Sequence, residues 1–136
     1  MELLFGTGAL LRGAGMVLVA LAAALHVFIA GVEMLGWTGP VAHRLFNLEP
    51  AFARQTREMA ANQGFYNLML AVEMVAGLVG MLMGTAWGLP LAIAGAASTV
   101  AAGGFLYLTS PDKRSSAVNQ LAPGLLGTVL LVLSAL

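Results

Sequence analysis

The sequence contains 136 residues, of which 60% are hydrophobic and only 9% are charged, and its formal net charge is zero. Soluble domains carry about 25% charged residues, so this composition excludes an ordinary soluble protein and predicts an integral membrane protein surrounded by the lipid bilayer. Six Lys and Arg residues form no basic stripe for a nucleic acid, no cysteine is present for a disulfide, and two histidines cannot close a metal site; no metal and no cofactor are expected.

The first apolar run, at residues 13–37, is predicted to be a membrane span because a helix needs about 20 apolar residues to cross a bilayer. Arg12 followed by "MVLVALAAAL" also fits a secretory signal. The run continues without a cleavage site as far as Trp37, so we expect a span that is retained. His26 and Glu33 are seven residues apart and therefore share one face of this helix.

The longest link, residues 38–58, contains Pro40 and Pro50, each well placed to open a short helix. Apolar and charged residues alternate irregularly along it, as is typical of a segment that lies at the membrane surface. We therefore predict a short interfacial helix between the first two spans. A helix that begins at Pro50 is expected to continue directly into the second span.

Three further spans are predicted at residues 59–83, 89–108 and 117–136, joined by the links "GTAWG" and "TSPDKRSS". Pro90 falls in the first turn of the third span, where the missing N–H group is harmless. The predicted fold class is all-α: an antiparallel, up-down four-helix bundle that forms a single domain over residues 1–136.

The basic residues predict the orientation of the bundle. The links at 38–58 and 109–116 carry five basic residues, Arg44, Arg54, Arg57, Lys113 and Arg114, whereas the other side carries only Arg12. Short loops rich in Lys and Arg remain in the cytoplasm. We expect a multi-pass protein of the inner (plasma) membrane with both termini outside.

Polar side chains fall at one level near the predicted cytoplasmic side of all four spans, because each residue advances a helix by 1.5 Å. This polar level contains Glu33, Asn62, Gln63, Tyr66, Asn67, Tyr107, Asn119 and Gln120. His26 and Glu73 lie deeper. Ionisable groups at such depth normally face the bundle interior or a wet cavity. The pattern predicts a polar pocket that opens to the cytoplasm and is floored by His26 and Glu73.

Each candidate residue is assigned a role within this pocket. The candidate catalytic residues are Glu33, Tyr66, Glu73 and His26, and the candidate substrate-binding residues are Trp37, Asn62, Gln63, Asn67, Asn119, Gln120 and Tyr107. The alternative is that the amides and hydroxyls only join helices through hydrogen bonds. Trp37 alternatively anchors the chain at the membrane interface.

Two segments, "EMLGWTGPVAHRLFNLEPAF" and "AANQGFYNLMLA", resemble the small membrane proteins grouped as domain of unknown function family 1304. The matching residues are Glu33, Met34, Trp37, Thr38 and Pro40, then Asn62, Gln63, Gly64, Tyr66 and Asn67, with His26 and the pair Gln120 and Pro123. The resemblance implies a four-helix membrane fold and supplies no reaction.

The leading functional hypothesis is an enzyme or binding protein for a lipophilic small molecule. Glu33 would act as general acid or base, oriented by Tyr66 and Asn62, in an isomerisation, a hydration or an epoxide opening. One alternative is a small transporter or binder of lipophilic cations, and another is an accessory subunit without a ligand. The five-to-one charge bias argues against a dimer of oppositely inserted copies, and a homo-oligomer of one orientation stays open.

Overall fold

A computed structural model describes residues 2–136, with side-chain environments from Gly6 onward. The long helices are α1 (Glu2–Leu35), α4 (Arg57–Leu82), α5 (Gly88–Thr109) and α6 (Arg114–Leu133), and the short ones are α2 (Pro40–Phe46), α3 (Pro50–Gln55) and the 3-10 helix η1 (Pro111–Lys113). Four stretches are long and apolar enough to cross a membrane: Gly6–Leu35, Arg57–Leu82, Gly88–Thr109 and Pro111–Leu133. The predicted all-α, four-helix class is confirmed.

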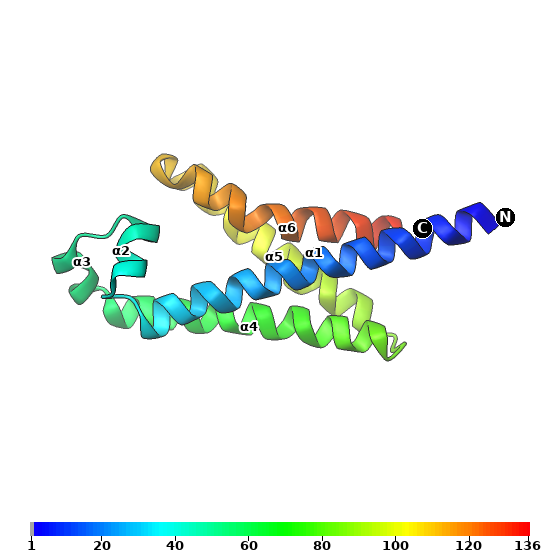
Figure 1. Cartoon of the computed structure of the whole chain (residues 1–136), viewed down its shortest axis with the longest axis horizontal. Coiled ribbons are helices and arrows are strands. Elements are labelled where there is room, and N and C mark those ends of the chain that lie inside the picture. Colours follow the sequence, from blue (N-terminus) through cyan, green and yellow to red (C-terminus); the bar gives the residue numbers. More distant parts are fainter. Residues whose placement is uncertain (1) are drawn as a thin grey trace.

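The four long helices run up and down and close into a ring (Figure 1). α1 packs against α4, α4 against α5, α5 against α6, and α6 returns to α1. Both ends of the chain lie at one end of the bundle, here called the terminal end. The other end, which carries α2, α3 and η1, is called the loop end.

The link between the first two spans forms two short helices, and a proline is the first residue of each, as predicted. α1 ends at Leu35 rather than at Trp37, because Gly36 and Gly39 follow before Pro40 opens α2. The expectation that the second short helix runs directly into the next span is wrong by one residue. Thr56, with φ −102° and ψ 9°, separates α3 from α4.

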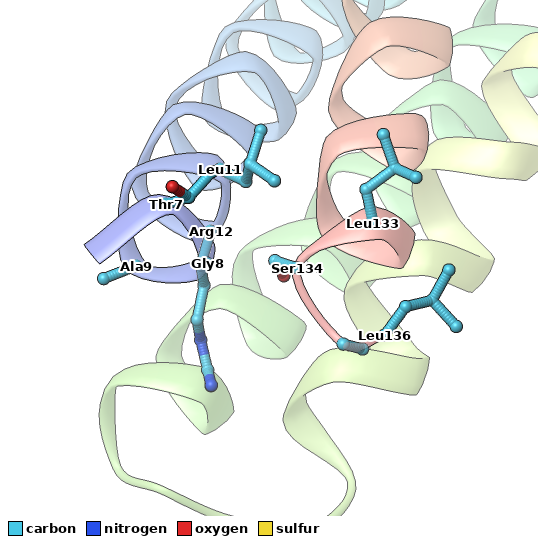
Figure 2. Close-up of a pocket in the computed structure, with 9 residues that line it drawn as sticks. Thr7, Gly8, Ala9, Leu11, Arg12, Leu133, Ser134 and Leu136 are labelled. Carbon is cyan, nitrogen blue, oxygen red and sulfur yellow. The ribbon is translucent and has the colours of Figure 1, made fainter. Parts of the chain in front are cut away.

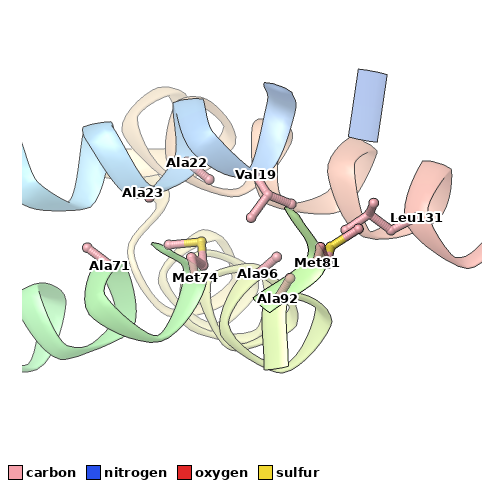
Figure 3. Close-up of a cluster of buried hydrophobic side chains, with 9 residues drawn as sticks. All are labelled: Val19, Ala22, Ala23, Ala71, Met74, Met81, Ala92, Ala96 and Leu131. Atoms are coloured by element: carbon pink, nitrogen blue, oxygen red, sulfur yellow. The ribbon is translucent and has the colours of Figure 1, made fainter. Parts of the chain in front are cut away.

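The apolar core is built mainly from small residues (Figure 3). Its buried members are Val19, Ala22, Ala23, Ala71, Met74, Met81, Ala92, Ala96 and Leu131. A Cβ atom added at Gly77 would lie only 2.6 Å from the Cα atom of Ala92, so the backbones of α4 and α5 are in contact there. Close packing through small residues is what holds membrane helices together, since lipid offers no hydrophobic driving force.

Candidate functional site

Glu33 and Asn67 form a buried hydrogen bond between α1 and α4. The Nδ2 atom of Asn67 donates to the Oε2 atom of Glu33 over 2.8 Å, and the two residues are 8% and 5% exposed. Gly64, one turn before Asn67, allows this approach, because a Cβ atom there would lie 2.9 Å from the Cβ atom of Glu33. The pair has the geometry of a polar contact that joins two helices.

His26 lies in the centre of the bundle with no exposed surface. Its Nδ1 atom is 2.8 Å from the carbonyl oxygen of Ala22, one turn earlier. A carbonyl oxygen only accepts, so Nδ1 carries the hydrogen, and Nε2 of the neutral ring is an acceptor. The Nε2 amide atom of Gln120 lies 3.4 Å from this acceptor and donates to it. His26 therefore connects α1 to α6.

A cleft of about 310 Å³ opens at the loop end, between α1, α2 and the start of α6. Its apolar walls are Leu25, Phe28, Ile29, Leu45, Phe46 and Leu106, and its polar residues are Asn47, Asp112, Lys113, Ser116, Asn119 and Gln120. Gln120 belongs to both this loop-end cleft and the contact with His26. The cleft is thus apolar along its walls and connected to a buried histidine through one amide.

Four polar residues at the loop-end cleft are not found by sequence reasoning: Asn47, Asp112, Lys113 and Ser116. They lie in or beside the links, where helical periodicity does not indicate which way a side chain points. One signal in the sequence could have found them. Leu45 and Phe46 are apolar residues next to each other in a polar link, and they need an apolar surface to cover, which the structure places on α1.

The polar residues of α4 do not all face one cavity, and this part of the prediction is wrong. Asn62, Gln63 and Tyr66 are exposed on the outer face of the helix, with Tyr66 59% exposed. The stripe that points inward consists of Ala60, Gly64, Asn67, Ala71, Met74, Gly77, Gly80 and Met81. Small residues select the packed face because they let neighbouring backbones approach, so polarity alone is a poor guide to facing. The roles assigned to the three exposed residues stay predictions.

Glu73 is half-buried where α4 meets α5. A Cβ atom at Gly95 would lie 3.4 Å from the Cγ atom of Glu73, so the stem of the glutamate packs on α5. Its carboxylate makes no hydrogen bond or ion pair with any residue that the structure describes, and no hydrogen bond joins it to His26. The predicted floor made of His26 and Glu73 is therefore not formed by direct contact.

Trp37 and Tyr107 hold the loop end together. The Nε1 atom of Trp37 donates to Thr56 Oγ1 over 3.0 Å, and its ring lies 5.2 Å from that of Phe46. The guanidinium carbon of Arg114 lies over the ring of Tyr107, 5.0 Å from the ring centre. Neither aromatic residue lines the loop-end cleft, whereas Asn119 and Gln120, also predicted to bind substrate, do.

A second hollow, of about 670 Å³, lies at the terminal end of the bundle (Figure 2). It runs between the first turns of α1, at residues 7–12, and the end of the chain, at residues 133–136. Among the lining residues that the structure describes, Arg12 is the one charged side chain, and it lies at the opposite end from Glu33 and the loop-end cleft. In the part of the chain that the structure describes, no group of three or more His, Asp or Glu residues could hold a metal.

A family model described as "Protein of unknown function (DUF1304)" matches residues 20–132. The chain belongs to this family. The DUF1304 match includes every residue that lines the loop-end cleft, and it contains His26, Glu33 and Asn67. It includes none of the residues that line the terminal hollow. No curated protein and no solved structure matches the chain.

Proposed function

We propose that this membrane protein binds a lipophilic small molecule in the loop-end cleft, with the polar group of the ligand beside Gln120. The observation that supports this proposal most strongly is the composition of the cleft, which combines apolar walls from three helices with one inner amide. Its volume of about 310 Å³ is within the range of small-molecule pockets, roughly 300–1,000 Å³. The extent of the family match also favours this cleft over the terminal hollow.

The polarity of the ligand follows from the hydrogen bonds behind the cleft. The carbonyl of Ala22 sets the tautomer of His26, and the acceptor nitrogen of His26 sets the orientation of the Gln120 amide. The Oε1 atom of Gln120 then has no hydrogen-bond partner among the described residues. An amide oxygen only accepts. We therefore infer a ligand whose polar group donates, such as a hydroxyl or an N–H, attached to an apolar body.

Binding is better supported than catalysis. The reactions expected from the sequence require a side chain that exchanges a proton with the ligand. Glu33 does not line the loop-end cleft, and His26 reaches it only through Gln120. The one carboxyl group among the lining residues belongs to Asp112, at the exposed rim. The contact between Glu33 and Asn67 favours the alternative in which these groups join helices.

The cleft is proposed to open toward the cytoplasm. The five basic residues of the two links at the loop end, against Arg12 at the terminal end, support this orientation. A ligand that dissolves in the bilayer would then enter from the membrane and place its polar group beside Gln120, while Asn119 and Ser116 form the water-facing rim.

The test compares medium-chain alcohols with alkanes of the same length, using displacement of a lipophilic fluorescent dye from the protein purified in detergent. We expect saturable displacement by the alcohols. Gln120→Leu should weaken it about tenfold or more, because the variant keeps the shape and loses the acceptor for a buried polar group. Gln55→Leu is the matched control, since Gln55 is exposed at the end of α3 and does not line the cleft.

Equal displacement by the parent protein and by Gln120→Leu would refute the proposed binding mode. Mass spectrometry of the same mixtures, extended to lipophilic epoxides and alkenes, tests the enzymatic alternative. A product formed by the parent protein and not by Glu33→Gln would restore the catalytic role that the sequence suggests for Glu33.

A further inference from the structure

A third hollow, of about 400 Å³, lies at the loop end between the end of α1, the short helices α2 and α3, and the start of α4. It is lined by Thr38, His43, Pro50, Arg54 and Arg57 and is here called the basic hollow. Every polar side chain in this set is a hydrogen-bond donor, and none is a carboxylate. The lining is therefore suited to an anion.

The fold brings these residues together through Trp37. This side chain donates to Thr56 at the junction of α3 and α4, and its ring packs on Phe46 at the end of α2. The end of α1 is thereby fixed to both short helices. Arg54 lies in the last turn of α3 and Arg57 is the first residue of α4, and both line the basic hollow.

The cationic side chains of the basic hollow lack acidic partners. Glu49 and Glu58 are close in sequence, yet no ion pair joins either of them to Arg54 or Arg57 in the described part of the chain. The side chain of His43 likewise makes no hydrogen bond there. The two guanidinium groups repel each other when no anion is bound. A bound anion would accept hydrogen bonds from both of them and from the imidazole.

We propose that the basic hollow binds a phosphate group. The planar fork of an arginine matches two phosphate oxygens at once, and a phosphate has oxygens enough for two arginines, a histidine and a threonine. The hollow also lies where the candidate span Gly6–Leu35 ends and the candidate span Arg57–Leu82 begins, which is the level of lipid headgroups. This site is separate from the loop-end cleft and does not depend on the function proposed for it.

The same phosphate chemistry can come from a phospholipid headgroup or from a water-soluble phosphate compound, and the experiment distinguishes them. Isothermal titration calorimetry is carried out on the full chain in a sugar-headed detergent at fixed ionic strength. The probes are inorganic phosphate, dihexanoyl phosphatidylglycerol, and dihexanoyl glycerol, which has the same chains and no phosphate. Saturable binding of at least one phosphate probe, and none of dihexanoyl glycerol, is expected.

Arg54→Gln and Arg57→Gln should each weaken this binding about tenfold or more, because each removes a charge-assisted hydrogen bond. Arg57→Lys keeps the charge and loses the fork, so a smaller loss is expected. Arg44→Gln removes the same charge from α2 without touching the basic hollow, and it should change the affinity by less than about threefold, as for an exposed charge.

A lipid probe that binds much more tightly than inorganic phosphate supports a headgroup ligand, and similar affinities support a water-soluble one. Equal losses for Arg44→Gln and Arg57→Gln would overturn the proposal, since they would show a general charge effect and no defined site. Absence of saturable binding for both phosphate probes would overturn it as well. Both arginines are exposed, so the variants should fold, and thermal unfolding of each variant verifies this.

Discussion

Replacement of Gly64 by alanine should separate α1 from α4 beside the contact between Glu33 and Asn67. The added Cβ atom would lie 2.7 Å from Met34 Cγ, 2.9 Å from Glu33 Cβ and 3.1 Å from the carbonyl oxygen of Ala30. Met34 can move its side chain, but the other two atoms are fixed to the backbone of α1. Since ordinary contacts begin at 3.4 Å, the helices would have to move apart by about half an ångström.

This displacement lengthens the hydrogen bond one turn away. The 2.8 Å distance between Asn67 Nδ2 and Glu33 Oε2 would rise to about 3.3 Å, beyond the usual range of about 2.7–3.2 Å. Overpacking of this kind typically costs about 1–3 kcal/mol. Alanine also has a higher helix propensity than glycine, by about 1 kcal/mol, and this gain opposes the cost. A second Gly→Ala variant without the steric contact is needed to measure the gain alone.

Gly31→Ala provides that control, because Gly31 is also inside α1 and a Cβ atom there meets nothing within 4 Å. Both variants gain the same propensity, so their unfolding free energies should differ by about 1–3 kcal/mol. The measurement is equilibrium unfolding in mixed detergent micelles. If Gly64→Ala proved as stable as Gly31→Ala, the close approach of α1 and α4 at this point would be refuted.

Three further outcomes are expected. Glu33→Gln should leave the unfolding free energy unchanged or raise it, since the amide oxygen still accepts from Asn67 and no charge is buried. Asn67→Leu should lower the unfolding free energy by about 0.6–2 kcal/mol, because the hydrogen bond between the helices is lost. A large loss of stability for Glu33→Gln would contradict this interpretation. Trp37→Phe should lower the unfolding free energy by about 0.5–1.5 kcal/mol, because it removes the hydrogen bond to Thr56. Limited proteolysis of this variant should show faster cleavage between α2 and α3, and an unchanged cleavage rate would contradict a role for this contact. An alkaline phosphatase fused to the C-terminus should be active outside the cytoplasm, and an inactive fusion would reverse the proposed orientation.

Hydropathy and turn chemistry were sufficient to predict the helices. The spans follow from apolar length, and Pro40 and Pro50 open helices because a proline at the first helical position loses no hydrogen bond. α1 begins at Glu2, well before the predicted start at residue 13, and it includes the stretch "GTGALLRG" that precedes the most apolar part of the span. Sequence patterns place such boundaries poorly, since a helix can extend beyond the part that lipid surrounds.

Which side chains meet was harder to predict. The family motif around Gly64 was expected to place all its amides in one pocket, and the structure buries only Asn67 among them. Gly64 faces α1, and the helix must therefore turn Asn62 and Gln63 outward. Helical spacing fixes relative directions around one helix, but it does not say which direction is inward. The loop-end cleft depends on how the link folds back on α1, which has no periodic signal.

The closure of the ring by the first and last helices makes the order of synthesis important for the loop-end cleft. Glu33 and Asn67 are 34 residues apart and can meet as soon as α4 is inserted, whereas His26 and Gln120 are 94 residues apart. Chains are made from the N-terminus, so His26 has no partner on α6 and the cleft lacks a wall until the last helix arrives. The ligand proposed for the cleft would bind only the finished bundle and stabilise it by mass action, and a chain stopped after α5 would gain no such stabilisation. Cellular levels of the protein should therefore rise with the supply of its ligand, and incomplete chains should remain targets for degradation.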